Sequence, residues 1–235
     1  MKDNSIMEKF QSAYKSKHST ETALLKVYND IMYNIDQGRG ILLVLLDLSA
    51  AFDTIDHDIL FDILEHSLGI SGLALKLLKS YLHGRTQCVQ INGVISEFAD
   101  LVCGVPQGSV LGPLKFCIYM LPIGSILQHH GIDYHIYADD TQLYVSFDVS
   151  NPSTAIDKIN LCISDLRTWM IKKKLKINDS KTEFLVITSS FLKTMYDNLQ
   201  LEVGMSKISS STKARNLGVI FDKFMNLDAH IGNIC

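Results

Sequence analysis

Hydrophobic residues recur along the chain first at helical spacing and then in a continuous run typical of a strand. From Ser19 to Gln37, apolar side chains recur every three or four positions, which predicts a helix that Ser19 caps and Gly38 ends. The run ILLVLL at 41–46 is apolar without interruption and has the length of a strand. Such a run predicts a strand that is buried on both faces.

Two later stretches have the pattern of β-hairpins. Residues 87–97 alternate between polar and apolar side chains around Asn92-Gly93, the dipeptide most typical of a tight hairpin turn. The stretch DYHIYADDTQLYVSF at 133–147 predicts a strand, a tight acidic turn and a second strand. A turn and strand are also expected at 177–187 and a last short strand at 216–221, whereas the Ser/Thr-rich residues 188–213 have only a loose pattern.

The remaining elements are predicted as helices. The Gly/Pro-rich loop GVPQGSVLGP at 104–113 is expected to enter a helix near Ser109 that Pro122 ends or kinks. Amphipathic spacing predicts another helix after Pro152 that reaches the basic run at 172–174. Further helices are predicted at 50–66 and 73–83. Because strands and helices alternate without a regular βαβ order, the expected class is α+β, a sheet with helices on one face.

Three aspartates stand where a carboxylate is costly. Asp47 ends the buried strand, and Asp139 and Asp140 share the tip of a predicted hairpin. A carboxylate at the end of an apolar strand requires a partner or a metal, and adjacent carboxylates repel each other until a cation such as Mg²⁺ or Mn²⁺ binds. Two simpler explanations stay open, because aspartate favours turns and Asp47 could cap a helix over 49–58.

Composition excludes several classes of protein. The 235 residues are 47% hydrophobic and 20% charged, which is typical of a folded globular chain. The net charge of −3 gives no compositional indication of nucleic-acid binding. No apolar run is long enough to span a bilayer, the first residues do not resemble a signal peptide, and the five cysteines are scattered. An intracellular protein of the nucleus or cytoplasm is therefore expected, with no membrane partner.

Five motifs follow one another in a recognisable order. They are LDLSAAFDTIDHDIL (46–60), GVPQGSVLGPL (104–114), YADD (137–140), LKINDSKTEFLVI (175–187) and NLGVIFD (216–222). Together they resemble the palm motifs of reverse transcriptases from non-LTR (LINE-like) retrotransposons, and QSAYKSKHSTETALL (11–25) resembles the stretch ahead of the palm in those elements. The resemblance implies a polymerase palm-type antiparallel sheet over 41–235, partial fingers with a lead-in helix over 1–40, and no thumb.

The resemblance also implies a two-metal site. Asp47, Asp139 and Asp140 match the metal-binding aspartates of the family, with the Leu48 carbonyl as an additional ligand. Two Mg²⁺ ions, with Mn²⁺ as an alternative, would promote attack of a primer 3′-hydroxyl on the α-phosphate of a dNTP. The implied partners are an RNA template with a DNA primer, dNTPs, and the fingers, thumb and endonuclease segments of a longer polyprotein.

Four other residues match family positions with roles around the substrate. Phe52 matches a steric gate that excludes the ribose 2′-hydroxyl, and Gln107 and Gly108 match the loop that contacts the incoming dNTP. Lys181 matches a proposed general acid that protonates pyrophosphate. The simpler explanations are a core phenylalanine at 52 and an exposed lysine at 181.

Departures from the family pattern keep an alternative function open. Lys15 stands where arginine is common, and Lys115 stands where the family has an apolar side chain, so Lys115 is expected to strain the packing unless it reaches solvent. The main hypothesis is RNA-directed DNA polymerase. The alternatives are a catalytically inactive retrotransposon remnant that only binds nucleic acid or protein, and a different nucleotidyltransferase, because palm-type sheets host several chemistries.

Overall fold

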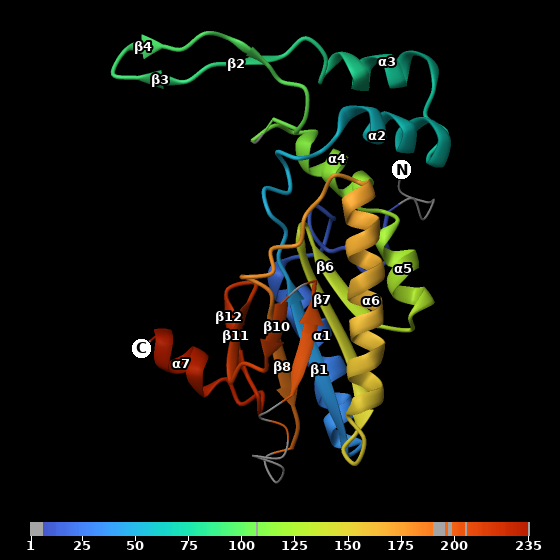
Figure 1. Ribbon diagram of the computed structural model, residues 1–235, viewed down its shortest axis with the longest axis vertical. Coiled ribbons are helices and arrows are strands. Elements are labelled where there is room, and N and C mark those ends of the chain that lie inside the picture. The colour runs from blue at the N-terminus through green and yellow to red at the C-terminus, as the bar shows by residue number, and fades with distance from the viewer. Residues whose placement is uncertain (1–6, 107, 190–195, 197–198, 205, 235) are drawn as a thin grey trace.

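A four-stranded antiparallel sheet in the order β6-β7-β1-β8 forms the centre of the molecule (Figure 1). The computed structural model describes residues 7–106, 108–189, 196, 199–204 and 206–234. The strands of the sheet are Asp133–Tyr137 (β6), Asp140–Asp148 (β7), Arg39–Leu46 (β1) and Glu183–Ile187 (β8). The strand β1 is interior, so it is hydrogen-bonded on both edges.

Helices and small hairpins surround this sheet. The helices are Thr20–Asp36 (α1), His57–Asp62 (α2), the π-helix Ile63–Ser67, Gly72–Ser80 (α3), Gly112–Tyr119 (α4), Ile123–His129 (α5), Ser153–Lys172 (α6) and Asp228–Ile234 (α7). The two-stranded units pair Thr86–Gln87 (β2) with Ala99–Asp100 (β5), Gln90–Ile91 (β3) with Val94–Ile95 (β4), Gln200–Val203 (β9) with Ser206–Ser209 (β10), and Lys213–Asn216 (β11) with Val219–Asp222 (β12). Within the described residues, no helix combines the length and the apolar character that crossing a bilayer requires.

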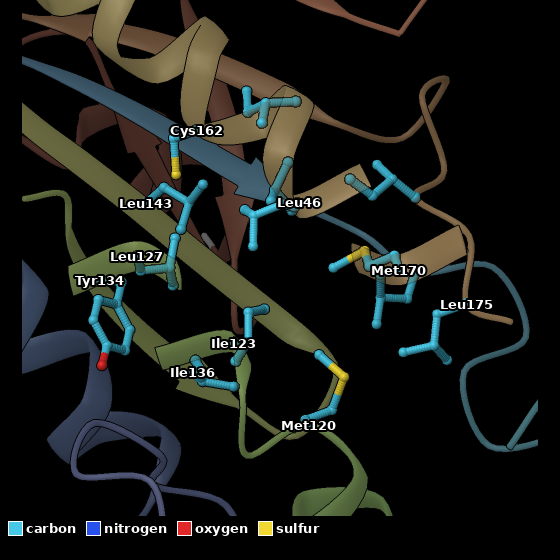
Figure 2. Packing of buried hydrophobic residues seen from close by; sticks show 14 of the residues in the cluster. Leu46, Met120, Ile123, Leu127, Tyr134, Ile136, Leu143, Cys162, Met170 and Leu175 are labelled. Carbon is cyan, nitrogen blue, oxygen red and sulfur yellow. The ribbon is translucent and has the colours of Figure 1, made fainter. Parts of the chain in front are cut away.

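Alternate residues of β1 enter two separate hydrophobic cores. Leu42, Val44 and Leu46 face the larger core, which α4, α5 and α6 cover (Figure 2). Ile41 and Leu43 face the smaller core, which contains residues of α1 and of the β11–β12 hairpin. All five side chains are 2% exposed or less, so the prediction of a strand buried on both faces is confirmed.

The prediction that helices cover one face of the sheet is wrong. Figure 1 shows α6 on one side of the sheet and α1 on the other. Val27 and Ile31 of α1 are fully buried against the second face. A sheet whose central strand is apolar on both faces must be shielded from water on both faces. The helix α1 shields much of the second face.

Several elements follow the sequence closely. Ser19 caps α1 through a capping box in which its Oγ accepts from the Thr22 amide and the Thr22 Oγ1 accepts from the Ser19 amide. The strands β3 and β4 pair Ile91 with Val94 around Asn92-Gly93, which confirms the predicted hairpin. Local signals were sufficient in both places because capping and tight turns depend on neighbouring residues.

The helix predicted over 50–66 begins later than expected. Residues 50–56 form turns and a bridge, with Ala50 at a φ of +48°. The helix starts at His57, and the Asp56 carboxylate caps it by accepting from the Ile59 amide at 3.0 Å. The predicted cap at Asp47 does not form, because Asp47 leads into turns. The helix expected near Ser109 likewise starts only at Gly112.

The last third of the chain contains more strands than expected. The hairpin β9–β10 lies within the loosely patterned region, where no strand was predicted. The single strand expected at 216–221 is a hairpin, since Asn216 pairs with Val219 across Leu217-Gly218. These strands have mixed polar and apolar residues, so their pattern is weaker than that of a fully buried strand.

Leu43→Ala tests the two-sided burial of β1. We expect it to lower the free energy of unfolding by about 2–5 kcal/mol, since Leu43 is 0% exposed and the truncation leaves a cavity. Leu25→Ala on α1 is the matched control, because its side chain is 68% exposed. This variant should change the free energy of unfolding by less than about 0.5 kcal/mol. Urea denaturation measures both, and equal losses would contradict the assignment of Leu43 to a core.

Candidate active site

One end of β1 brings together residues from neighbouring strands. The last registered pair of β1 with β7 is Leu46 with Thr141. One position further along this ladder, Asp47 and Asp140 stand across from each other, because partners in an antiparallel pair advance together in opposite directions. Two of the aspartates predicted from the sequence are therefore neighbours in space.

The other edge of β1 adds a cation. Leu45 pairs with Glu183 of β8, and the chain ahead of Glu183 turns so that the Asn178 amide, and not Lys181, pairs with the Asp47 carbonyl. Lys181 lies in this turn. The Lys181 Nζ lies 3.8 Å from the Asp47 Oδ2, and 69% of the Lys181 side chain is exposed. An exposed pair of this kind contributes little to stability, and the long side chain keeps its freedom to move. Lys181 is therefore at the site and accessible from solvent.

Asp139 sits in a two-residue turn between β6 and β7. Tyr137 pairs with Asp140, which leaves Ala138 and Asp139 at the tip of the hairpin. Ala138 has a φ of +58° although it is not glycine. This left-handed conformation costs an alanine about 1–2 kcal/mol. The turn thus carries local strain directly beside the two acidic residues.

The three carboxylates influence one another electrostatically. Loss of solvent around its carboxyl, followed by repulsion from Asp139 and then Asp47, raises the pKa of Asp140 to about 6. The Asp47 Oδ2 is buried and accepts no hydrogen bond within the described part of the chain. A buried carboxylate oxygen of this kind is costly, so a bound cation would be favourable here. The donor chemistry fits a hard divalent cation such as Mg²⁺.

The geometry of a complete metal-ligand set stays a prediction. Across the described ranges, no three histidine, cysteine, aspartate or glutamate side chains stand close enough together to hold a metal ion. The Leu48 carbonyl, the additional predicted ligand, lies where β1 pairing continues toward 176–178. The bonds there run from the Asn178 amide to the Asp47 carbonyl and from the Ser49 amide to the Lys176 carbonyl, both at 2.9 Å, so neither uses the Leu48 carbonyl.

The turn after Asp47 is joined to the Gly/Pro-rich loop through the backbone. The Val105 amide donates to the Phe52 carbonyl at 2.9 Å, and the Gly104 amide donates to the Ile55 carbonyl at 2.7 Å. Gly104 has a φ of +84°, and a Cβ there would lie 2.9 Å from the Asp53 carbonyl oxygen. A glycine is required by both its backbone conformation and this close approach. Two motifs far apart in sequence are therefore fixed against each other.

The predicted substrate-binding residues lie around this junction. The half-buried ring of Phe52 stacks on Phe116 of α4, with centroids 4.7 Å apart and an interplanar angle of 21°. Gly108 has a φ of +75°, and the space where a Cβ would stand is open. Gln107 lies outside the described residues. Phe52 thus stacks on a second ring, and there is open space beside Gly108. The roles of both residues toward a nucleotide stay predictions.

The comparisons with known proteins agree on one family. A family model described as reverse transcriptase (RNA-dependent DNA polymerase) matches residues 1–221. The chain belongs to the reverse transcriptase family. The resemblance seen in the five sequence motifs is therefore confirmed.

Curated relatives of this chain come from mobile elements. It is 27% identical to the probable RNA-directed DNA polymerase from transposon X-element and 26% identical to that from transposon BS, both of Drosophila melanogaster. The alignments cover 100% and 98% of this chain but 25% of each relative. It is also 25% identical to the RNA-directed DNA polymerase from mobile element jockey of Drosophila funebris, over 96% of this chain and 24% of that one. The chain thus spans about a quarter of the relatives' length.

Solved structures confirm a mixed helix and sheet fold shared with telomerase. Truncated apo telomerase from Candida tropicalis superposes with a TM-score of 0.62 at 16% identity, covering 92% of this chain and 40% of that one. Telomerase of the same organism in complex with a fragment of telomeric RNA superposes with a TM-score of 0.60 at 15% identity, covering 92% and 33%. At such low identity the likeness concerns the fold alone.

Two residues near the β6–β7 hairpin, Gln11 and Tyr14, have no role that the sequence alone predicts. Gln11 contacts the backbone of Ala138. Tyr14 is 61% exposed at a φ of +59°, and its pKa is raised by partial burial first, then by Cys117, Asp139 and Tyr137. Both lie in the stretch 11–25, which resembles the segment ahead of the palm in non-LTR retrotransposons. Hydrophobic spacing gives no signal for them, since the hairpin residues that they approach lie more than a hundred positions away.

A polar contact also links the last hairpin to β7. The Asn216 Nδ2 of β11 donates to the Gln142 Oε1 of β7 at 3.0 Å, and both residues are buried. Gln142 is two positions after Asp140, on the same face of the strand. The NLGVIFD motif is therefore anchored close to the acidic end of the sheet.

Lys115 is the clearest departure from the reverse transcriptase pattern. It is 1% exposed, and its Nζ has no hydrogen-bond partner among the residues described. The Nζ lies 3.6 Å from the centroid of the Tyr81 ring. Burial, followed by repulsion from Arg85, lowers the pKa of Lys115 to about 8. The Lys115 side chain does not reach solvent, so the cation–π contact with the Tyr81 ring is the main interaction that offsets the cost of burying its charge.

Lys115→Met tests the cost of this buried ammonium. At pH 7 we expect a rise in Tm of at least ~2 °C, the shift that about 1 kcal/mol produces in a domain of this size. The folded-state pKa lies below the unfolded value, so the wild-type chain gains stability as pH rises from about 8 to 10.5, and the variant should lack this slope. Calorimetry measures Tm across this range.

Lys76→Met on α3 is the matched control, since Lys76 is exposed. It should keep the wild-type dependence of Tm on pH. A lower Tm for Lys115→Met, or a wild-type slope in that variant, would contradict the assignment.

Proposed function

We propose that this chain is the palm of a retrotransposon reverse transcriptase and catalyses RNA-directed DNA synthesis. The observation that supports the proposal is the position of Asp140 beside the turn residue Asp139 and near enough to Asp47 that both carboxylates raise its pKa, in a chain of this family. The Asp47 Oδ2, which accepts no hydrogen bond within the described residues, and the raised pKa of Asp140 support a place that favours a cation. Carboxylates gathered in this way suit phosphoryl transfer.

The aspartates would hold divalent cations, and these ions would contact the reacting groups. Reverse transcriptases use divalent metal ions, and Asp47, Asp139, Asp140 and the Leu48 carbonyl are the proposed ligands for two Mg²⁺ ions, with Mn²⁺ as an alternative. Such ions supply Lewis-acid stabilisation of the attacking and leaving oxygens. The protein contributes defined positions for its carboxylates, because the Asp47 carbonyl accepts from the Asn178 amide directly after β1 and Asp140 pairs with Tyr137 in the hairpin.

Lys181 is the proposed proton donor to the leaving pyrophosphate. Its ammonium stands beside Asp47 and is accessible, so it can approach a phosphate oxygen without rearrangement of the sheet. Breaking the α–β phosphoanhydride bond leaves negative charge on pyrophosphate. A proton donated there at the transition state stabilises the leaving group.

The remaining proposed contacts concern the nucleotide and the template. Phe52 would exclude the ribose 2′-hydroxyl, and Gln107 and Gly108 would contact the incoming dNTP. The solved telomerase complex with a telomeric RNA fragment supports an RNA partner for this fold. We assign residues 1–40 to partial fingers and a lead-in helix and 41–235 to the palm, with fingers, thumb and endonuclease segments of a longer polyprotein as further partners.

Asp139→Ala tests the carboxylate site. In primer extension on an RNA template with dNTPs and Mg²⁺, we expect a loss of at least ~10²-fold in rate, since a group that stabilises transition-state charge is removed. Asp58→Ala, at an exposed position in the first turn of α2, should retain the wild-type rate. Equal rates for wild type and Asp139→Ala would overturn the proposal, and a wild-type chain that binds RNA but does not extend the primer would favour a binding module.

Phe52→Val tests the steric gate. The smaller side chain should reduce the preference for dNTP over rNTP by about 10-fold or more, since shape discrimination depends on the bulk of the pocket wall. The measurement is kcat/KM for dCTP and CTP in the same primer-extension assay. Phe98→Val is the matched control because Phe98 is 70% exposed between β4 and β5. Unchanged selectivity in Phe52→Val would assign Phe52 to packing alone.

A further inference from the structure

A buried glutamine contacts both backbone groups of the residue that precedes Asp139. The Gln11 Oε1 accepts from the Ala138 amide at 3.1 Å, and the Gln11 Nε2 donates to the Ala138 carbonyl at 3.4 Å. The same Oε1 accepts from the Ala13 amide at 2.8 Å. We call the two contacts between Gln11 and Ala138 the Gln11 clasp. It connects the tip of the catalytic hairpin to a segment over 120 positions earlier.

Backbone pairing fixes Gln11 next to the hairpin. The Ser12 amide donates to the Ile136 carbonyl, and the Ile136 amide donates to the Phe10 carbonyl, both at 2.9 Å. This parallel bridge extends the edge of the sheet beyond β6. Gln11 is only 3% exposed, so water does not compete for its amide. The glutamine is therefore held in place before it contacts the turn.

The clasp acts on a strained residue of the site. The Ala138 amide and carbonyl belong to the two peptide groups on either side of its Cα, and their orientations define its φ and ψ. Ala138 has a φ of +58° and is 7% exposed. An alanine does not favour this conformation, so an unsupported turn would relax toward negative φ. Such a change would rotate Asp139, the next residue.

We propose that Gln11 is a positioning residue that holds Ala138 in its left-handed conformation and so orients Asp139 and Asp140. This inference rests on the proposed function, because it assigns the precision of the carboxylate site to a residue that touches neither metal nor substrate. Metal ligands require a shell of hydrogen bonds that orients them, and small displacements of reacting groups are costly in rate.

Gln11→Leu removes the clasp with little change in volume. In primer extension we expect kcat to fall by ~10- to 100-fold, with a higher Mg²⁺ concentration for half-maximal rate and a nearly unchanged KM for dNTP. Ser12→Ala is the matched control. It removes a buried contact of 2.8 Å between the Ser12 Oγ and the His135 Nε2, on the same segment but away from Ala138. We expect its kcat and Mg²⁺ dependence to stay within about twofold of wild type.

A second substitution separates positioning from general stability. Glycine adopts positive φ without strain, so Ala138→Gly should make the clasp less necessary. The double variant Gln11→Leu/Ala138→Gly should regain most of the kcat lost in Gln11→Leu, and Gln11→Glu, which can accept but not donate when ionised, should lie between Gln11→Leu and wild type. No recovery in the double variant, or equal losses in Gln11→Leu and Ser12→Ala, would overturn the proposal.

Hydrogen exchange gives a measurement that does not depend on activity. The Ala138 amide should exchange at least about tenfold faster in Gln11→Leu than in wild type, and Ser12→Ala should leave its rate unchanged. If exchange behaves in this way while wild type does not extend a primer, the proposed function fails and the clasp stands as a structural contact. An Ala138 amide that exchanges equally in wild type and Gln11→Leu overturns the clasp whatever the activity.

Discussion

The register of β1 against its two neighbours is the constraint on which the site depends. In this antiparallel sheet, the pairing of Leu46 with Thr141 places Asp47 across from Asp140, and the turn that precedes Glu183 brings Lys181 to the other side of Asp47. A slip of one residue would move every side chain of β1 to the opposite face. Burial of β1 in two cores makes such a slip costly, so hydrophobic packing determines where the charges meet.

The same packing supports a site that is unfavourable by itself. Asp47 carries a buried oxygen without a hydrogen bond, Asp140 has a raised pKa, and Ala138 holds a left-handed conformation. Each of these features costs free energy locally, and local strain of this kind persists where the surrounding structure determines the conformation. The two buried cores and the Gln11 clasp provide that support from different sides. Lys181 contributes little to it, because its ion pair is exposed.

The sequence predicted what local interactions determine and missed what distant contacts determine. The Ser19 capping box, the Asn92-Gly93 hairpin and the buried β1 depend on residues close in sequence or on an unbroken apolar pattern. The apolar run of β1 indicates that both faces need cover, but that α1 supplies much of the second cover depends on tertiary packing, which no local pattern reveals. The start of α2 at His57 depends on backbone pairing between the turn after Asp47 and the distant loop around Gly104.

The residues of the candidate site also fall into two groups, those that the sequence indicates and those that only the structure reveals. Asp47, Asp139 and Asp140 could be named because carboxylates at strand ends and turn tips are unusual, and the structure brings them into electrostatic contact. Gln11 could not be given a role, because a glutamine carries no charge and its partner is the backbone of Ala138 rather than a distinctive side chain. Residues that orient a site through backbone contacts leave no compositional signal. The sequence therefore identifies the groups that carry charge in the proposed chemistry, whereas the structure is needed to find the groups that hold them in place.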